Sequence, residues 1–226
     1  MKGRAIDLGH MAYTPAWDVQ KRMADEVIGG GPDTLLFVEH DHVMTLGASF
    51  QPNNLLLGEK QLNELGIDVV RTDRGGDVTY HRPRQLVIYP VFDIRKHGHD
   101  LHKWLRDLEE VVIRTVAQFG LEGERKPDVN TGVFVNGKKI AAIGVKVRKW
   151  VNLHGIALNC DNDLKEFSHI NPCGITTHGV TNLSNESGGR TTIEDARPVV
   201  KGAFEDVFGI ELQYVDVGEL LAEHDA

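Results

Sequence analysis

Lys139 and Cys173 are the residues of this chain whose side chains are best suited to covalent catalysis. Cys173 stands between Pro172 and Gly174, a setting typical of a turn that exposes a small side chain. A lysine ammonium group near a thiol favours the thiolate, which is the nucleophilic form of cysteine. The pair indicates acyl transfer through a thioester, although a solvated lysine and a buried structural cysteine are common uses of these residue types.

Small residues mark further segments that could contact a ligand. Gly144 stands inside a predicted strand, where glycine often marks a bulge or the close passage of a ligand. Gly155 and Ala157 share one face of another predicted strand, because side chains alternate along a strand. That face could line a slot for an extended apolar group or pack against a neighbouring strand. Gly75 and Gly76 would let the backbone approach a ligand, but their spacing does not fit a phosphate or dinucleotide loop.

Two other kinds of site are possible from the residue types alone. Zinc is bound by cysteine and histidine, and the chain has Cys160, Cys173, His154, His169 and His178 close together in sequence. No CxxC or HxxxH spacing occurs among them, so we expect no metal site. A cysteine protease would need a histidine base, for which His154 or His178 could serve, but no signature of such a family is present.

The hydrophobic pattern places these residues on strands and helices. Helices are predicted at 17–28, 59–65 and 101–119 and from Thr191 onward, and strands at 34–39, 43–46, 67–71, 86–92, 140–147 and 153–158. Asn136-Gly137 predicts a hairpin turn, since both residues tolerate positive φ. Thr191 and Glu194 have the spacing of a capping box, and Pro198 could split the last helix. Strands mixed with unevenly spaced helices favour an α/β fold of the mixed α+β kind.

Composition limits the class of protein. A chain of 226 residues can form one domain, 1–226, with an acidic tail from about residue 218 that we expect to be frayed. The net charge of −8 argues against bulk binding of nucleic acid. Two cysteines are too few for a disulfide framework, and no apolar run is long enough for a signal peptide or a membrane span. These features predict a cytoplasmic protein.

Several motifs, in their order along the chain, resemble the lipoyl(octanoyl) transferase family. They are RGGDVTYH at 74–81, GKKIAAIGVKV at 137–147, HGIALN at 154–159 and INPCG at 170–174. Shorter matches occur at 39–47, at Gln85 with Tyr89-Pro90, and at 179–183. Together they cover residues from about 35 to 185, most of the chain.

The resemblance implies a fold related to the biotin and lipoate protein ligases, with mixed β-sheets and flanking helices. It implies that Cys173 and Lys139 are catalytic and that no cofactor is needed. The implied contacts with the acyl chain come from Arg74, Gly75, Gly76, Asp77, Val78, Thr79, Tyr80 and His81, from Ala142, Ile143 and Gly144, and from Gly155, Ile156 and Ala157.

The resemblance also implies the substrates. Octanoyl-acyl carrier protein would be the donor, and a lysine of a lipoyl domain, in 2-oxoacid dehydrogenase complexes or the glycine cleavage H protein, would be the acceptor. Two alternatives remain open: an ATP-dependent lipoate or biotin-type protein ligase, and a non-catalytic acyl-binding relative.

One segment departs from the family's pattern. Where the family has Gly-Pro-Gly after the signature histidine, this chain has Arg82-Pro83-Arg84. An arginine there is strained if the backbone needs positive φ. We also expect Arg82 and Arg84 to add positive charge near the mouth of the site, which would favour acidic carrier proteins.

Overall fold

The computed structural model describes residues 1–126, 129, 131–165, 167 and 179–218. In chain order the elements are β1 (Lys2–His10), α1 (Tyr13–Ile28), β2 (Thr34–Glu39), β3 (Val43–Leu46), η1 (Pro52–Asn54), α2 (Glu59–Glu64), β4 (Asp68–Arg71), β5 (Val78–His81), β6 (Gln85–Val91), η2 (Ile94–His97), α3 (Leu101–Ala117), β7 (Glu124–Arg125), β8 (Gly132–Val135), β9 (Lys138–Arg148), β10 (Val151–Asn159), α4 (Leu183–Ser187), α5 (Ile193–Phe208) and β11 (Glu211–Tyr214).

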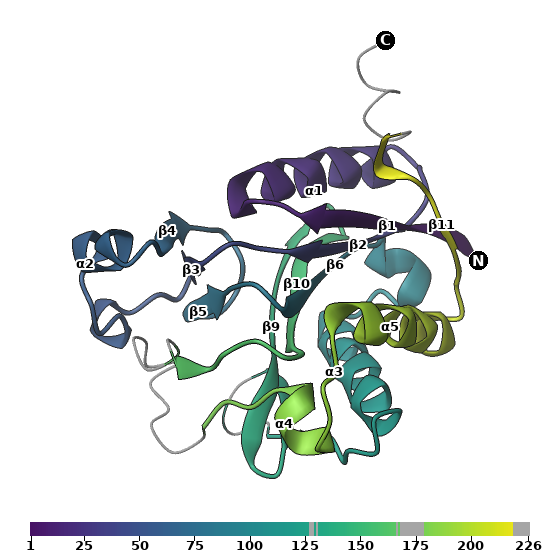
Figure 1. The fold of residues 1–226 in the computed structure, drawn as a ribbon. Helices are drawn as coiled ribbons and strands as arrows, with labels where there is room; N and C mark the ends of the chain where they lie inside the picture. Colours follow the sequence, from purple (N-terminus) through teal and green to yellow (C-terminus); the bar gives the residue numbers. More distant parts are fainter. Residues whose placement is uncertain (127–128, 130, 166, 168–178, 219–226) are drawn as a thin grey trace.

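These strands form two sheets in the described part of the chain. The large sheet has the order β11-β1-β2-β6-β10-β9-β8-β7, and the small sheet has the order β4-β3-β5. Both are mixed: β1 runs parallel to β2 and β11, whereas β6, β10 and β9 pair in an antiparallel manner. The small sheet and α2 extend to one side of the large sheet (Figure 1). The predicted mixed α/β fold is confirmed.

Helices cover both faces of the large sheet. Helix α1 packs on one face, where its buried side chains meet those of β2, β6 and β10; we call this the α1 face. Helices α3 and α5 pack together on the opposite face, the α3–α5 face (Figure 1). Strand side chains alternate between these two cores, as the twofold period of a strand requires.

The predicted elements are present, with shifted ends. Helix α3 begins at its N-cap Asp100, whose carboxylate accepts from the backbone N–H groups of His102 and Lys103, and it ends at Ala117. The Asn136-Gly137 turn is confirmed, with φ values of 49° and 75°. The capping box predicted at Thr191 is wrong: Thr192 and Asp195 form it, and Thr191 is buried. Pro198 lies inside α5, which remains one helix.

Strands β1, β5, β7 and β11 and the short helix α4 were not predicted. Strand β1 is short of apolar residues at its ends and gains its order by pairing with β2 and β11. Strand β5 lies in the 74–81 motif, for which ligand contacts but no strand were predicted. Helix α1 begins at Tyr13, four residues earlier than predicted, and Pro15 in its first turn is compatible with that start because the N–H groups there have no intrahelical acceptor.

Candidate active site

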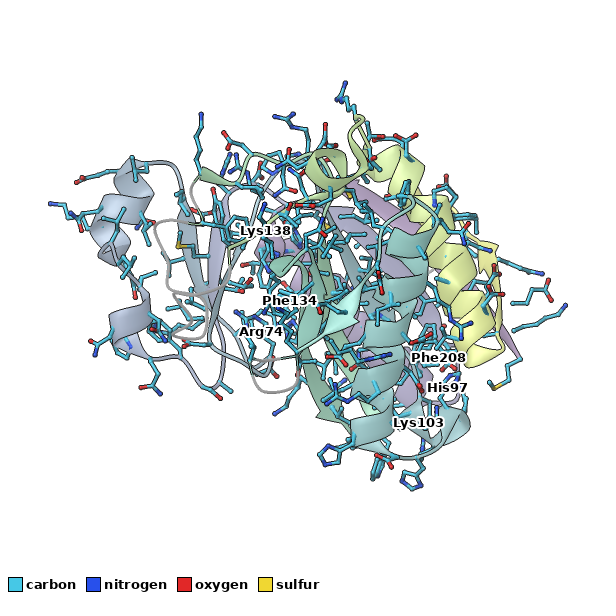
Figure 2. The ribbon with its side chains drawn as sticks, turned by 90° about the horizontal axis from the view of Figure 1, so that it is seen from below. Arg74, His97, Lys103, Phe134, Lys138 and Phe208 are labelled. Carbon is cyan, nitrogen blue, oxygen red and sulfur yellow. The ribbon has the colours of Figure 1, made fainter. Side chains whose placement is uncertain are left out.

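A cavity of about 450 Å³ lies where the small sheet meets the β9–β10 pair. We call it the β9–β10 cavity. Arg74 and Phe134 lie in this central region, between the small sheet and the helices α3 and α5 (Figure 2). The cavity brings together almost all the candidate site residues of the described chain: Arg74, Gly75, Gly76, Asp77, Val78, Thr79, His81, Lys139, Ala142, Ile143, Gly144, Gly155, Ile156 and Ala157.

Tyr80 does not line the cavity. It is fully buried in the core of the small sheet with Met44 and Leu62, and its hydroxyl is hydrogen-bonded to His42. Thr79 and His81 stand on one face of β5 and Tyr80 on the other. Val78, which shares the face of Tyr80 and its core, also reaches the cavity from the start of the strand.

A β-bulge turns Lys139 toward the cavity. On β8, Phe134 is opposite Lys139 and Val133 is opposite Ala141, so Ile140 is an extra residue on β9. Because of this extra residue, Lys139 shares a face with Ala142 rather than with Ala141, which packs in the core on the α3–α5 face. Its Nζ atom lies 5.3 Å from the centre of the Phe134 ring.

Lys138 shows the opposite environment one residue away. Its side chain is half exposed and its Nζ lies 3.8 Å from a carboxylate oxygen of Glu186 in α4. It does not line the cavity. The two adjacent lysines therefore point in opposite directions, as alternation along a strand requires.

Small residues form one side of the cavity. Ala157 is opposite Ala142 and Gly155 is opposite Gly144, so these four residues make a strip along the paired strands. A Cβ atom on Gly144 would lie 2.8 Å from the carbonyl oxygen of Gly75, and the N–H of Gly75 donates to Val145. Because these residues are small, the backbone of the Gly75–Gly76 loop can pack against the strip, and the strip also lines the cavity. On Gly155 a Cβ atom would meet the Ile88 oxygen at 2.3 Å, so tight strand packing also applies there.

Arg74 holds the loop rather than presenting a free guanidinium to a ligand. Its guanidinium donates to Thr45 Oγ1 and to the carbonyl oxygens of Thr45, Gly75 and Asp77, at 2.5 to 3.0 Å. These bonds fix the turn that brings Gly75 and Gly76 over the small-residue strip.

A chain of side chains with fixed orientations forms another wall. The amide nitrogen of Gln85 donates to Asn159 Oδ1 at 2.9 Å, so Gln85 Oε1 accepts from His81 Nδ1, also at 2.9 Å. Asn159 in turn donates to the Thr181 carbonyl oxygen, and the N–H of Thr181 donates to the carbonyl of Lys139. The wall thus links His81 to the backbone of Lys139.

Pro90 accounts for the position of His154. Ile156 of β10 is opposite Ile88 of β6, so two residues further along His154 falls opposite Pro90. Proline has no N–H to donate to β10, and His154, with φ of 57°, lies outside the ladder that β10 forms with β6. Its own N–H donates to Gln20 Oε1, and Asn152 Nδ2 donates to the carbonyl oxygens of both Pro90 and His154.

Burial keeps the histidines around the cavity neutral. Burial lowers the pKa of His40 to about 4 and lowers the pKa of His81 well below its usual value. The pKa of His154 is also lowered, again chiefly by burial, although its Nε2 lies 2.9 Å from Asp73. Neutral imidazoles line the cavity at physiological pH, so they add no net charge to it.

Of the two cysteines, Cys160 lies among the described residues. Cys160 is fully buried in the core on the α3–α5 face, is not in a disulfide, and has its pKa raised to about 12 by burial. Such a thiol is a poor nucleophile. Cys173, with His169 and His178, lies outside the described residues. Within those residues no group of His, Cys, Asp and Glu side chains could hold a metal ion.

The Arg82-Pro83-Arg84 segment differs between its two arginines. Arg84 has φ of 68°, the left-handed region that favours glycine, whereas Arg82 does not have positive φ. Arg82 is buried, with its guanidinium 5.7 Å from the centre of the Tyr80 ring. Arg84 is half exposed and lies 3.7 Å from Asp161. The expectation that both arginines add surface charge is therefore wrong for Arg82.

Some cavity residues have no local signal in the sequence. Tyr13 and Tyr89 line the cavity with His154, and Tyr13 lies 141 positions from the histidine to which it hydrogen-bonds. Only the pairing of distant strands and α1 brings them together. Asp73, the partner of His154 at the cavity's edge, was missed for the same reason.

Comparison with known proteins assigns the family. The model of the lipoyl protein ligase A/B catalytic domain matches residues 12–205. The octanoyltransferase of Rubrobacter xylanophilus is 47% identical over 204 residues, which cover 89% of this chain and 91% of that protein. The octanoyltransferase of Geobacter metallireducens is 42% identical over 214 residues, 94% of this chain and 97% of that protein.

A solved structure of a similar fold is lipoate-protein ligase A bound with ATP, at a TM-score of 0.77 and 21% identity, covering 96% of this chain and 89% of that one. At this identity the likeness concerns the fold alone. Among the described residues, no helix is long and apolar enough to cross a lipid bilayer. The extent and identity of the sequence matches decide the assignment: this chain belongs to the lipoyl(octanoyl) transferase family, whose members are acyltransferases.

Proposed function

We propose that this enzyme transfers an octanoyl group from an acyl carrier protein to a lysine of a lipoyl domain, through a thioester on Cys173. The carrying observation is that Lys139 lines a cavity with a small-residue strip, in a chain whose relatives are named octanoyltransferases. The strip offers an extended apolar slot, which suits a saturated acyl chain. The buried Cys160 leaves Cys173 as the candidate nucleophile.

The chain that follows Cys173 limits how far its thiol can lie from Lys139. Gly179, six residues after Cys173, accepts a hydrogen bond from the Lys139 N–H at 2.9 Å, and Thr181 donates to the Lys139 carbonyl. Six residues span at most about 20 Å, which keeps Cys173 within reach of the cavity. The Pro-Cys-Gly sequence would expose the thiol there.

The first half-reaction forms the acyl-enzyme. The ammonium group of Lys139 favours the Cys173 thiolate, which attacks the carbonyl carbon of the carrier's thioester. The bond from that carbon to the carrier sulfur breaks, and the departing thiolate takes a proton from Lys139. The octanoyl group is then on Cys173, and Lys139 is neutral.

The second half-reaction releases the product. The ε-amino group of a lipoyl-domain lysine attacks the new thioester, and its proton passes to the neutral Lys139. The Cys173 thiolate leaves, and an amide is formed. Conversion of a thioester to an amide is favourable, so the sequence of steps needs no ATP.

A transfer assay distinguishes this function from that of a ligase of similar fold. Octanoyl carrier protein and an isolated lipoyl domain are incubated with the enzyme, with and without ATP, and the lipoyl domain is weighed by mass spectrometry. We expect an octanoylated lipoyl domain without ATP. Product that requires ATP and free octanoate would identify a ligase, and reversible binding without product would identify a non-catalytic module.

A further inference from the structure

Tyr13 and His154 both line the β9–β10 cavity, and their side chains are hydrogen-bonded to each other. Strand β9 carries Lys139, and His154 is opposite Val145, six residues further along that strand. Six strand residues span about 20 Å between backbone positions, and the space left for a ligand is shorter because the side chains of Lys139 and Tyr13 line the cavity and occupy part of it. Lys139 and the Tyr13–His154 pair therefore mark opposite ends of the small-residue strip.

The polar atoms of this far end are satisfied within the protein. His154 Nε2 lies 2.9 Å from the carboxylate of Asp73 and donates to it, so Nδ1 accepts from the Tyr13 hydroxyl at 3.3 Å. Tyr89 donates in the same way to His40 Nε2 at 2.7 Å, because His40 Nδ1 donates to the Met11 carbonyl oxygen. With these atoms paired, the tyrosine and histidine rings are the surfaces left to meet an apolar chain.

The far end is also rigidly held. His154 is fixed from behind by Gln20 and by its place opposite Pro90, and the Tyr13 ring stacks against His81 at 5.7 Å. Tyr13 and His154 are both buried, whereas the side chain of Asp73 is half exposed. The ring of Trp17 packs against both of them, with its centre 6.3 Å from that of Tyr13 and 5.5 Å from that of His154.

We propose that the ring of Tyr13, held in place by His154, is the end wall that limits the length of the acyl chain this enzyme accepts. The inference rests on the proposed function, since it takes an acyl chain as the occupant of the cavity. A chain attached near Lys139 runs along the strip toward Gly144 and Gly155 and meets the Tyr13 ring with its terminal methyl group. Longer chains are refused because the ring does not yield.

The test is the chain-length profile of the enzyme. Hexanoyl, octanoyl, decanoyl and dodecanoyl carrier proteins are compared as donors by kcat/KM for transfer to a lipoyl domain. We expect Tyr13→Ala to raise the ratio of decanoyl to octanoyl transfer by roughly tenfold or more, the scale that one or two methylene groups have in a hydrophobic pocket. Tyr13→Leu preserves apolar packing and is expected to shift the ratio in the same direction, which covers the case in which Tyr13→Ala does not fold.

Two further variants separate the ring from other causes. Tyr13→Phe retains the ring and is expected to keep the octanoyl optimum. Tyr214→Ala removes an exposed tyrosine from β11 and is expected to leave the profile unchanged. An unchanged profile in a folded Tyr13→Leu enzyme, or an equal shift in Tyr13→Phe, would overturn the inference. Failure of the unaltered enzyme to transfer any of the four chains would instead overturn the proposed function.

Discussion

The two faces of the large sheet use their buried residues in opposite ways. The α3–α5 face is filled by large side chains, with Phe92, Trp104, Phe204 and Phe208 in mutual contact. The α1 face, next to the β9–β10 cavity, buries histidines and tyrosines in hydrogen-bonded pairs and leaves open space over small residues. His97 and Phe208 lie on the α3–α5 side, away from Arg74 and the cavity (Figure 2).

This difference assigns separate tasks to the two faces. Close-packed aromatic rings contribute burial of apolar area and stability. Buried polar groups contribute less to stability but fix positions and protonation states. We therefore expect substitutions on the cavity side to change activity with little loss of folding, and substitutions on the α3–α5 side to do the reverse.

The largest expected effect concerns Lys139. Lys139→Ala removes the proton carrier and should lower octanoyl transfer about 10²- to 10⁴-fold, while the free energy of unfolding changes little. It should also shift the pH profile for alkylation of Cys173 by iodoacetamide upward, because the thiolate loses its neighbouring cation. The matched control is Lys138→Ala, on the outward side of the bulge, which should change neither measurement. Equal losses in the two variants would contradict the assignment.

The next effect lies on the opposite face. Phe204 is fully buried between Phe92 and Phe208. Phe204→Ala should lower the free energy of unfolding by about 3–5 kcal/mol, measured by chemical denaturation, with transfer activity per folded molecule retained. Tyr214→Ala, at an exposed aromatic residue, is the control and should cost less than 1 kcal/mol or so. A loss of catalysis without a loss of stability in Phe204→Ala would contradict the expectation that the α3–α5 face contributes stability rather than activity.

The buried histidines on the cavity side should make the free energy of unfolding depend on pH. His40 has its pKa lowered from 6.5 to about 4 by burial, so between these values the unfolded chain binds more protons than the folded one. Stability therefore rises with pH across this window, and it is lost as pH falls from about 6.5 toward 4. His81 and His154, whose pKa values are also lowered, act in the same direction.

Denaturant unfolding at pH 7 and pH 5 measures this dependence. His40 alone can contribute on the order of 3 kcal/mol over the full window. His40→Gln can still accept from Tyr89 and donate to Met11, and it should make the loss between pH 7 and pH 5 smaller. A slope that is unaltered in His40→Gln would mean that His40 is not buried in its neutral form.

The smallest effect concerns Arg84, outside both cores. Its φ of 68° costs about 1 kcal/mol in a residue with a Cβ atom. Arg84→Gly should relieve that cost, partly offset by the loss of the contact between the half-exposed Arg84 side chain and the buried Asp161 carboxylate, which is worth about 1 kcal/mol. Arg84→Ala loses the same contact and keeps the strain, so the glycine variant should be about 1 kcal/mol more stable than the alanine variant. Equal stability of the two variants would show that the backbone there is not strained.

The sequence predicted most of the α3–α5 face and many of the residues that line the cavity, but not the geometry between them. The stripe of α3 and the Asn136-Gly137 turn depend on local periodicity and turn chemistry, and both were predicted correctly. The bulge at Ile140 depends on the register of β8 against β9, which no local pattern fixes. The same holds for Tyr13 and His154, which only the folded chain brings together.

Capping shows a finer limit of local patterns. Thr192 and Asp195 have the same spacing as Thr191 and Glu194, the pair predicted to form the capping box. Ser184 of α4 donates its hydroxyl to the Thr191 carbonyl and accepts from the Thr191 N–H, so Thr192 is the residue left to cap α5. A contact with another helix decided between two equivalent local signals.

The most direct test of transfer through a Cys173 thioester is to locate the acyl group on the enzyme. The protein is mixed with octanoyl carrier protein in the absence of ATP and lipoyl domain, digested, and mapped by tandem mass spectrometry. A Cys173 thioester predicts one octanoyl group on the peptide that contains Cys173. The group should be retained in Cys160→Ala and absent in Cys173→Ala. An octanoyl group on Cys160, or none unless ATP is added, would contradict it.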